Sequence, residues 1–398
     1  MPKILRIINR FNLGGPTYNA TFLTKYMAPE FQTLLIGGER DETEESSLHI
    51  PNSLGIEPLI IEEMKRPIRP LQDYKAYQKI KSIIKEFKPD IVHTHASKAG
   101  FIGRMAAYNE CVPVIVHTFH GHVFHSYFNS ATTGFFKKLE RYAASKSDAI
   151  IAISEKQKYE LSHIHHICND DKIKVIPLGF ELEKFSENTE KKRKSFRQHY
   201  NVAEDEIVIA IIGRLVPIKN HSLFLEALKE VKEKSNRKIR AFIVGDGEDR
   251  KKIEDKATEL GIDFVDALNS KGKATLTFTS WIKNVDWVNA GADIIALSSL
   301  NEGTPVSLIE AQASSKPIVS TAVGGIENVV IPGETALLSD KEDVGHFARN
   351  LLALVENDEL RLKMSQKGKD FVFEHFHYKR LVNDMSNLYY QLLAQKQK

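Results

Sequence analysis

The chain has 398 residues, 42% of them hydrophobic and 27% charged, which is typical of a globular protein large enough for two cored domains. A net charge of +3 gives no general case for a nucleic-acid-binding protein. The only cysteines, Cys111 and Cys168, form no CxxC pair, which argues against a disulfide scaffold or a structural zinc site and favours a reducing cytoplasm.

Short apolar runs alternate with helical stretches in the first part of the chain. No apolar run approaches the ~18 residues that a membrane span needs, and the N-terminal run resembles a first strand more than a signal peptide. The pattern predicts parallel βαβ units. The predicted strands are "KILRII", "TLLIGG", "DIVHTH", "PVIVHTFHG", "DAIIAIS" and "IKVIPLG".

A polar, charged stretch after Gly179 marks a domain boundary, and a second α/β set follows it. We predict an N-terminal Rossmann-like domain over residues 1–182, a linker with a short helix over 183–204 and a second Rossmann-like domain over 205–374. The last segment is helical by pattern. The fold class is therefore α/β, with two parallel-sheet domains expected to face each other across a cleft that is lined by strand ends.

The segment "EGTPVSLIE" places Glu302 and Glu310 on either side of a predicted helix start, with Thr304 as N-cap and Pro305 as the first helical residue. A phosphate bound at that start would lie between two carboxylates that can accept hydrogen bonds from hydroxyl groups. A sugar joined through a diphosphate to a ribose has this layout. The alternative is a helix whose acidic residues merely favour its dipole.

Two cations favour the functional interpretation. Arg214 and Lys219, in "GRLVPIKN", follow the first predicted strand of the second domain. A departing diphosphate needs positive charge to stabilise it, and Arg and Lys supply this charge.

The chain resembles the retaining GT-B glycosyltransferases of family 4, nearly from end to end. The resemblance is carried by "NLGGP", "DIVHTHASKAGFIGRMAA", "HTFHGH", "AIIAISE", "IPLGFE", "GRLVPIKN", "FIVGDGEDR" and "SLNEGTPVSLIEAQASSKPIVSTAVGG". The most specific element is the pair of glutamates combined with Gly-Arg-Leu and a lysine, whereas "VGDG" by itself is a weak indication of the family.

The resemblance implies roles for individual residues. Glu310 binds the donor ribose, Glu302 binds the hydroxyls of the transferred sugar, and His120 contacts that sugar. Arg214 and Lys219 hold the diphosphate. A closing helix at about 375–398 packs back on the N-terminal domain. Backbone atoms frame the sugar and phosphate of the donor at Gly303, Thr304, Pro305 and Val306. Gly14 and Gly15, in the first loop, approach the diphosphate or the acceptor, and Ser154 matches a family serine.

Two departures from the family pattern limit this transfer of roles. Asn19 stands where relatives often have histidine, which leaves the contacts with the acceptor undefined. The stretch "HTFHGHVFHSYF" is richer in histidine and aromatic residues than the general pattern. His117, His120, His122 and His125 could be counted as metal ligands, but no carboxylate or cysteine frames them, and we expect only His120 to be functional.

No Asp-x-Asp occurs, so the sequence predicts no metal and no other cofactor, with Arg214, Lys219 and the helix dipole in their place. The expected reaction is retaining, front-face transfer from a nucleotide sugar, UDP-sugar being favoured, to a lipid-linked or polysaccharide acceptor in cell-envelope glycan synthesis. Two other interpretations stay open, a sugar-nucleotide epimerase and a non-catalytic nucleotide-sugar-binding subunit.

The expected location is the cytoplasm, with the inner face of the cell membrane as the alternative that stays open. The stretch "GFFKKLERYAASK" (134–146) mixes aromatic with basic residues. It predicts either a helix with a core face and a solvated face, or a helix lying on an anionic membrane.

Overall fold

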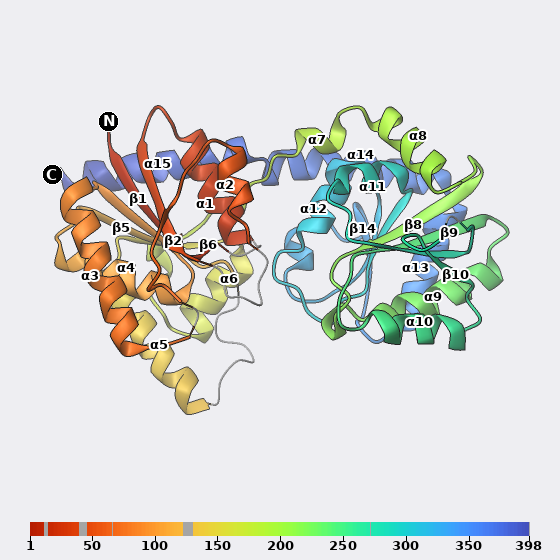
Figure 1. The fold of residues 1–398 in the computed structure, drawn as a ribbon, viewed down its shortest axis with the longest axis horizontal. Helices are drawn as coiled ribbons and strands as arrows, with labels where there is room; N and C mark the ends of the chain where they lie inside the picture. Colours follow the sequence, from red (N-terminus) through yellow and green to blue (C-terminus); the bar gives the residue numbers. More distant parts are fainter. Residues whose placement is uncertain (12–14, 40–45, 66, 122–129, 271, 398) are drawn as a thin grey trace. The chain divides into compact units, whose positions relative to one another are not determined.

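The computed structural model describes residues 1–11, 15–39, 46–65, 67–121, 130–270 and 272–397. The chain forms two compact units. Unit 1 comprises Met1–Phe180 and Phe376–Lys398, and unit 2 comprises Glu181–His375. Each unit contains one seven-stranded sheet flanked by helices (Figure 1). All the strand pairs within these sheets are parallel, so the predicted class, α/β with two Rossmann-like domains, is confirmed.

The sheet of unit 1 has the strand order β3-β2-β1-β4-β5-β6-β7. The chain adds strands toward one edge from β1 to β3 and toward the other edge from β4 onward, so the order reverses between β1 and β4 although all strands stay parallel. Its strands are β1 (Lys3–Arg10), β2 (Gln32–Gly38), β3 (Leu59–Ile60), β4 (Ile91–His95), β5 (Val114–Thr118), β6 (Ala149–Ala152) and β7 (Ile173–Val175). Its helices are α1 (Gly15–Tyr26), α2 (His49–Ser53), α3 (Pro70–Phe87), α4 (Ser97–Asn109), α5 (Ser130–Ser145), α6 (Glu155–Tyr159) and α15 (Tyr378–Lys396).

Both faces of this sheet are covered, which is why its strands are continuous hydrophobic runs. Successive side chains of a strand point to opposite faces. Ile4 of β1 packs in the core with α1 and α15, whereas Leu5 packs in the core with α3 and α4.

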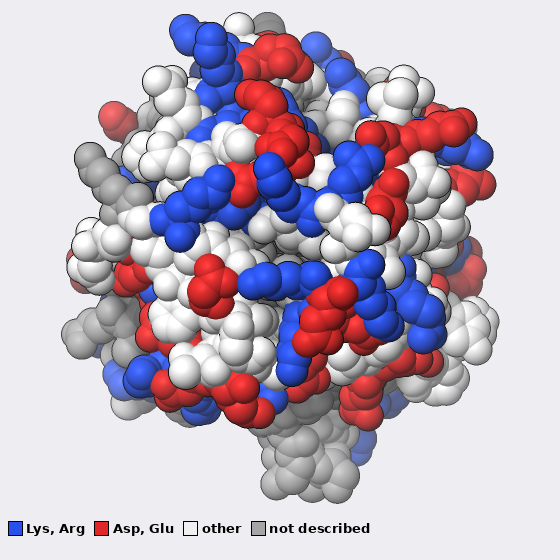
Figure 2. Space-filling model, turned by 90° about the vertical axis from the view of Figure 1, so that its right-hand side faces the viewer, with Lys and Arg blue, Asp and Glu red and all other residues white. Residues whose placement is uncertain are grey.

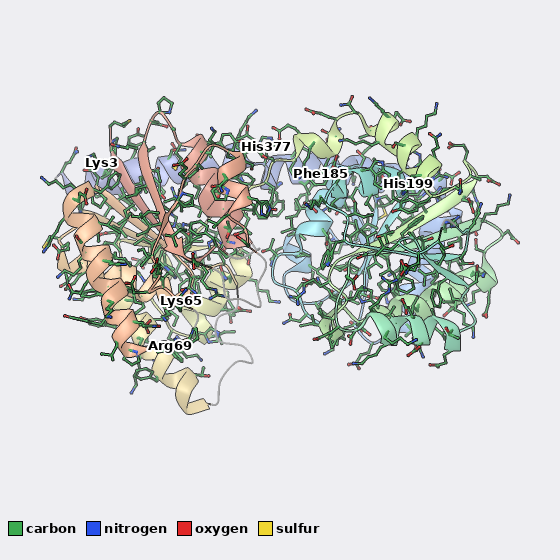
Figure 3. The ribbon with its side chains drawn as sticks, in the orientation of Figure 1. Lys3, Lys65, Arg69, Phe185, His199 and His377 are labelled. Atoms are coloured by element: carbon green, nitrogen blue, oxygen red, sulfur yellow. The ribbon has the colours of Figure 1, made fainter. Side chains whose placement is uncertain are left out.

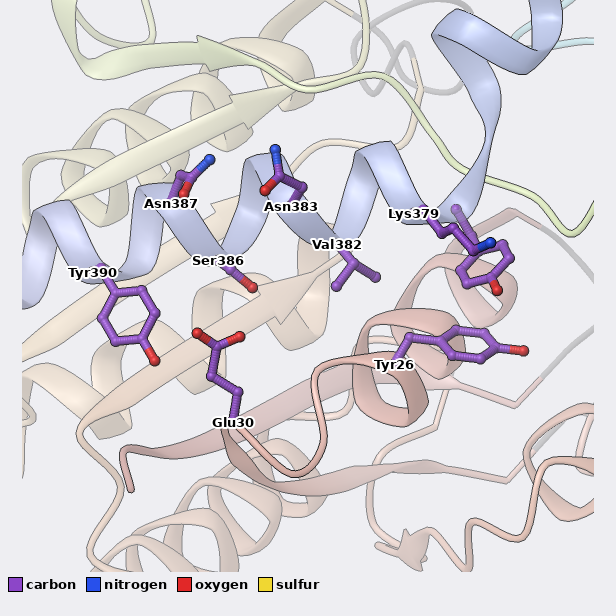
Figure 4. A pocket seen from close by; sticks show the side chains of 9 residues that line it. Tyr26, Glu30, Lys379, Val382, Asn383, Ser386, Asn387 and Tyr390 are labelled. Carbon is purple, nitrogen blue, oxygen red and sulfur yellow. The ribbon is translucent and has the colours of Figure 1, made fainter.

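The closing helix α15 belongs to unit 1. It buries five large side chains against the sheet: Leu381, Met385, Leu388, Tyr389 and Leu392. Beside it lies a hollow of about 430 Å³, lined by α15 and by Tyr26 and Glu30. In Figure 4, Glu30 points from the segment after α1 toward α15, and Tyr26 faces the start of that helix.

Tyr389 ties α15 to the centre of the sheet through two buried strand residues. The Arg6 guanidinium lies 2.9 Å from His93 Nδ1, and the Tyr389 hydroxyl lies 2.5 Å from the same nitrogen. Because a guanidinium only donates, Nδ1 must accept, and the ring proton lies on Nε2. That nitrogen then donates to Thr118 Oγ1 at 2.7 Å. Burial, with the nearby Arg6 charge, lowers the pKa of His93 well below its usual value, so the ring is neutral.

The sheet of unit 2 has the order β10-β11-β9-β8-β12-β13-β14 and reverses direction between β8 and β12. Its strands are β8 (Glu206–Ile212), β9 (Lys238–Val244), β10 (Phe264–Asp266), β11 (Leu276–Ser280), β12 (Ile294–Leu297), β13 (Ile318–Thr321) and β14 (Ala336–Ser339). Its helices are α7 (Glu183–Ser186), α8 (Thr189–His199), α9 (His221–Lys234), α10 (Arg250–Glu259), α11 (Val285–Gly291), α12 (Val306–Ala313), α13 (Val344–Glu356) and α14 (Asp358–Phe376).

The stretch 183–204, expected to be a linker with a short helix, instead forms α7 and α8 and is part of unit 2. Phe185 and His199, labelled in Figure 3, lie on these two helices. Phe196 of α8 is fully buried and packs edge-to-face on Trp287 of α11. In the sequence, Phe196 stands among charged residues, so the apolar contact that joins α8 to unit 2 could not be recognised there.

Among the described residues, no helix combines the length and the apolar character needed to cross a bilayer. On the face shown in Figure 2, basic and acidic side chains are interspersed, so this face presents no field of a single sign.

Candidate active site

The strongest candidate site in unit 2 lies at the carboxyl ends of β8 and β12. These strands are neighbours at the point where the sheet order reverses, the place where open α/β sheets bind ligands. Lys219 ends a 3₁₀ turn after β8, and Glu302 lies on the loop after β12. Lys219 Nζ is 2.5 Å from Glu302 Oε1. The structure therefore joins two predicted site residues that are 83 positions apart.

Hydrogen bonds hold this ion pair in place. The Ser299 hydroxyl donates to Glu302 Oε1 at 2.6 Å, and the Ser298 hydroxyl donates to the backbone carbonyl of Lys219 at 2.9 Å. Both charged side chains are mostly shielded from solvent, Lys219 being 21% and Glu302 11% exposed. Sequence reasoning missed both serines, although Ser299 is the first residue of the quoted motif and Ser298 directly precedes it.

Arg214 follows β8 and is exposed to solvent. Among the described residues, no carboxylate forms an ion pair with its guanidinium. Its loop is fixed by backbone bonds, since Leu215 N donates to the carbonyl of Asp246 at 3.0 Å. An exposed guanidinium on a fixed loop is suited to binding an anionic group bidentately.

The helix after Glu302 begins one residue later than predicted. Helix α12 starts at Val306, and Pro305 is its N-cap with ψ 93°, so Pro305 is not helical and Thr304 lies outside the cap. No side chain caps the first turn, which leaves its N–H groups directed at the loop. A Cβ placed on Gly303 would meet nothing within 4 Å. Thr304 is half-buried and Pro305 is buried.

Glu310 lies on α12 and is half-buried. Desolvation raises its pKa from an ordinary value of 4.5 to about 7, with Asp286 of α11 adding to the rise and Lys184 of α7 opposing it. Helix α7, from the stretch predicted as a linker, and helix α11 therefore both shape the electrostatics of this carboxyl group. A group that titrates near neutral pH in a folded protein is a candidate for function.

This raised pKa predicts a pH dependence of stability. Folded Glu310 keeps its proton up to about pH 7, while an unfolded glutamate loses it near 4.5, so the folded state binds more protons in between. Stability should therefore fall as pH rises through that window, by at most ~1.4 kcal/mol per pH unit. The free energy of unfolding of unit 2, measured in urea at pH 5, 6, 7 and 8, should decline less with pH in Glu310→Gln than in the wild type. If it depends on pH in the same way in both proteins, Glu310 does not have the raised pKa.

Two glycines that the sequence analysis did not single out shape the Glu302 loop. The Gly325 N–H donates to the Glu302 carbonyl at 3.0 Å. A Cβ on Gly325 would lie 1.9 Å from the Gly303 carbonyl oxygen, and one on Gly324 would lie 2.0 Å from that of Glu302. The Gly-Gly pair that ends the quoted motif "SLNEGTPVSLIEAQASSKPIVSTAVGG" was the available signal.

We expect Gly325→Ala to displace the Glu302 loop. The added Cβ meets backbone, which cannot move aside as a side chain can, so stability should fall by ~1–3 kcal/mol and the activity of the site should fall with it. The matched control is Gly345→Ala in α13, where a Cβ makes only ordinary contacts at 3.5 Å or more. Equal thermal midpoints for both variants would refute this prediction.

Among the described residues of unit 1 that were predicted, Gly15, His120 and Ser154 follow the strands β1, β5 and β6. Gly14 lies outside the described residues. Gly15 is the first residue of α1, and a Cβ there would make one ordinary contact, so local packing does not require glycine. Asn19 is buried within α1, and Ser154 is the N-cap of α6, accepting a hydrogen bond from the backbone N–H of Gln157 at 3.2 Å.

His120 follows β5, and its Nε2 lies 2.8 Å from Nδ1 of His95 at the end of β4. Burial lowers the pKa of His120 to about 3, so its ring is neutral near pH 7. His95 is fully buried, and burial lowers its pKa also. The structure thus adds His95, which the sequence analysis did not select, as the partner that orients His120. The available signal was that both predicted strands, "DIVHTH" and "PVIVHTFHG", have a histidine at or just after their carboxyl end.

Of the other histidines in "HTFHGHVFHSYF", only His117 lies among the described residues. His117 is fully buried and lies 2.8 Å from Thr94 Oγ1 through Nδ1. His122 and His125 lie outside the described residues. Across the described part of the chain, no group of three or more His, Cys, Asp or Glu side chains is placed to hold a metal ion.

Comparison with known families gives two matches that together cover most of the chain. The "Glycosyl transferases group 1" model matches residues 192–371, and the "Glycosyltransferase Family 4" model matches residues 20–184. An Escherichia coli UDP-Gal:alpha-D-GlcNAc-diphosphoundecaprenol alpha-1,3-galactosyltransferase is 30% identical over 336 residues, which are 83% of each protein. The Staphylococcus aureus capsular polysaccharide biosynthesis glycosyltransferase CapM is 25% identical, over 84% of this chain and 85% of CapM.

Solved structures show the same fold. The Anabaena protein Alr3699/HepE, solved in complex with UDP, superposes with a TM-score of 0.79 at 17% identity, and the match covers 98% of this chain and all of the other. The resemblance drawn from the sequence is therefore confirmed: the chain belongs to glycosyltransferase family 4 and has the GT-B fold.

Proposed function

We propose that this glycosyltransferase transfers a sugar from a UDP-sugar to a lipid-linked or polysaccharide acceptor in cell-envelope glycan synthesis, with retention of configuration. The observation that carries this proposal is the Lys219–Glu302 pair beside the Arg214 loop, at the reversal point of the unit 2 sheet. There, cations that suit a diphosphate lie next to a carboxylate that suits sugar hydroxyls.

In this mechanism one set of donor-site groups holds the diphosphate, and two glutamates bind hydroxyl groups. Arg214 binds the diphosphate and stabilises the charge that builds up as the bond to the sugar breaks. The N–H groups at the start of α12 and Lys219 share that task. Glu302 accepts hydrogen bonds from the sugar and keeps the Lys219 ammonium group in position. Glu310, when ionised, accepts bonds from the ribose hydroxyls.

The proposed transfer is a front-face reaction. The bond between the anomeric carbon and the donor phosphate breaks, and the acceptor oxygen forms its bond on the same face. The departing phosphate oxygen takes the proton of the acceptor hydroxyl. His120, being neutral, acts as a hydrogen-bonding group for the sugar rather than as an acid.

The proposed reaction is independent of metal ions because Arg214, Lys219 and the start of α12 supply the positive charge that a metal would otherwise provide. The names of the relatives favour the proposed substrates. The Escherichia coli enzyme uses UDP-Gal and a diphosphoundecaprenol-linked acceptor, and the Staphylococcus aureus protein acts in capsular polysaccharide biosynthesis. These substrates are carried over as a proposal.

The deciding experiment measures thermal stabilisation of the purified protein by UDP, GDP and ADP, each with and without EDTA. A ligand that binds only the folded state adds roughly 2.7 kcal/mol at a hundredfold excess over its Kd. We expect stabilisation by UDP, unchanged by EDTA and weakened in Glu310→Ala. Loss of the UDP effect with EDTA would overturn metal independence, and no stabilisation by any nucleotide would overturn the donor site.

Product analysis separates the alternative functions. Mass spectrometry after incubation with UDP-sugar and an acceptor should show the sugar joined to the acceptor, and NMR should show a retained anomeric configuration. An unchanged donor mass with inverted stereochemistry at one carbon would identify an epimerase. Full cellular function of Glu302→Ala would favour a non-catalytic subunit, and a sugar adduct on Glu302 would replace front-face transfer by a covalent route.

A further inference from the structure

Four buried hydroxyl groups lie at or beside the loop that carries Glu302. They belong to fully buried side chains that follow β12 or end β13: Ser298, Ser299, Ser320 and Thr321. Three of these hydroxyls donate to backbone carbonyl groups at 2.7–3.0 Å, which fixes the path of the chain. The Ser299 hydroxyl differs, because it donates to a charged side chain, Glu302 Oε1, at 2.6 Å. Its hydrogen bond therefore acts on a side chain of the site and not on the backbone.

The hydrogen bonds of Glu302 distinguish its two carboxylate oxygens. Oε1 accepts from Lys219 Nζ at 2.5 Å and from the Ser299 hydroxyl. These two donors match the roughly two lone pairs that one carboxylate oxygen offers. Within the described part of the chain, no group donates to Oε2. Oε2 is therefore the oxygen of this carboxylate that is left to accept hydrogen bonds from a ligand.

Ser299 and Lys219 restrain Glu302 in different ways. A lysine ammonium group is a point charge with three rotatable donors on a flexible stem, so it attracts a carboxylate without fixing its orientation. The last torsion of a glutamate side chain is broad, so the orientation of the carboxylate has to be set by a further contact. Ser299 supplies this contact from a fixed position, because its side chain is fully buried and its backbone carbonyl accepts the Thr321 hydroxyl at 2.7 Å.

We propose that Ser299 is a positioning residue for recognition of the donor sugar. Together with Lys219 it fills Oε1 of Glu302, and this directs Oε2 to the hydroxyl groups of the sugar. The inference rests on the proposed function and adds to it the residue that orients the sugar-binding carboxylate. A site that is built to bond particular hydroxyl groups discriminates against ligands that lack them. Ser299 therefore contributes to the preference for a nucleotide that carries its sugar over the nucleotide alone.

Separate affinities for the nucleotide and for the nucleotide sugar test this role. Calorimetry gives the Kd of UDP and of UDP-galactose, UDP-glucose and UDP-N-acetylglucosamine, and the UDP-sugar that binds most tightly is the probe. The measured quantity is the Kd of the probe divided by the Kd of UDP. In Ser299→Ala this ratio should rise by about tenfold, as for the loss of one hydrogen bond to a charged group, while the Kd of UDP stays within about twofold. An unchanged ratio would overturn the proposal.

Ser320→Ala is the matched control. It removes the same atom from an equally buried serine on the neighbouring strand, where the hydroxyl donates to the backbone carbonyl of Leu297. This variant should keep the wild-type ratio, whatever stability it loses. An equal rise in both variants would show a general disturbance of this sheet edge and would contradict a specific role. If Ser299→Ala does not fold, Ser299→Cys replaces it, because a thiol is only a weak donor, and the same rise in the ratio is expected.

A double-mutant cycle tests whether Ser299 acts through Glu302. In the Glu302→Ala background the partner of the Ser299 hydroxyl is gone, so adding Ser299→Ala should leave the ratio within about twofold of the single variant. A residue that only supports the fold would not lose its effect in this background. A second rise of about tenfold in the double variant would show that Ser299 acts by another route, and the proposal would then be wrong.

The same measurements separate this inference from the proposed function. If neither UDP nor any of the three UDP-sugars binds to the wild type, the proposed function fails. If Glu302→Ala leaves the ratio unchanged, the assignment of Glu302 to the sugar within that function fails. If Glu302→Ala raises the ratio and Ser299→Ala does not, the role of Ser299 fails and the donor site stands.

Discussion

Deleting residues 376–398 is expected to prevent unit 1 from folding. The deletion removes α15 and with it five large side chains that are buried against the sheet. Fully burying one such side chain contributes ~1.5–3 kcal/mol, so the five together contribute on the order of 10 kcal/mol. This is comparable with the ~5–15 kcal/mol that separates a folded domain from its unfolded chain. The deletion also leaves the buried Arg6 and His93 without the Tyr389 hydroxyl.

Soluble expression and circular dichroism of the truncated protein measure this effect. The matched control deletes only residues 394–398, which are exposed where the structure describes them. That deletion removes one surface ion pair, between Lys396 and Asp148 at 2.7 Å, and such pairs contribute ~0–1 kcal/mol. A well-folded protein without residues 376–398 would show that α15 is an accessory helix and not part of the unit 1 core.

Arg214→Ala is expected to lower kcat by about 10²–10³-fold, the usual effect of removing one group that stabilises charge in a transition state. The protein should stay folded, because Arg214 is exposed and its loop is held by backbone hydrogen bonds. If the guanidinium acts mainly as the leaving group departs, kcat and kcat/KM should fall together. Steady-state kinetics with UDP-sugar and acceptor measure both quantities.

The control for Arg214 is Arg237→Ala in the same unit. Arg237 pairs with Asp358 at 3.1 Å on the surface, away from the strand ends that carry the site. This change should leave kcat within about twofold, since exposed ion pairs contribute little. A rise in KM for the donor with unchanged kcat in Arg214→Ala would mean that the residue only binds the ground state. Its assignment as a leaving-group stabiliser would then be wrong.

The α/β class could be predicted from the sequence because the strands are covered on both faces. Each strand is consequently an uninterrupted apolar run, and the period changes in the helices between runs. The prediction of a linker was wrong for the stretch 183–204, because the apolar pattern there is hard to recognise. Its apolar anchor, Phe196, is surrounded by charged residues in the sequence, and only the packing against Trp287 reveals it as part of unit 2.

By itself, the sequence determined the fold class, and it predicted which residue types would bind a donor, because motif chemistry is local: two glutamates flank a turn, and cations follow a strand. Only the tertiary structure decided which groups meet. The reversal of strand order between β8 and β12 brings Lys219 to Glu302, and parallel pairing of β4 with β5 brings His95 to His120. Contacts between distant segments depend on strand order and on burial, which no local pattern encodes.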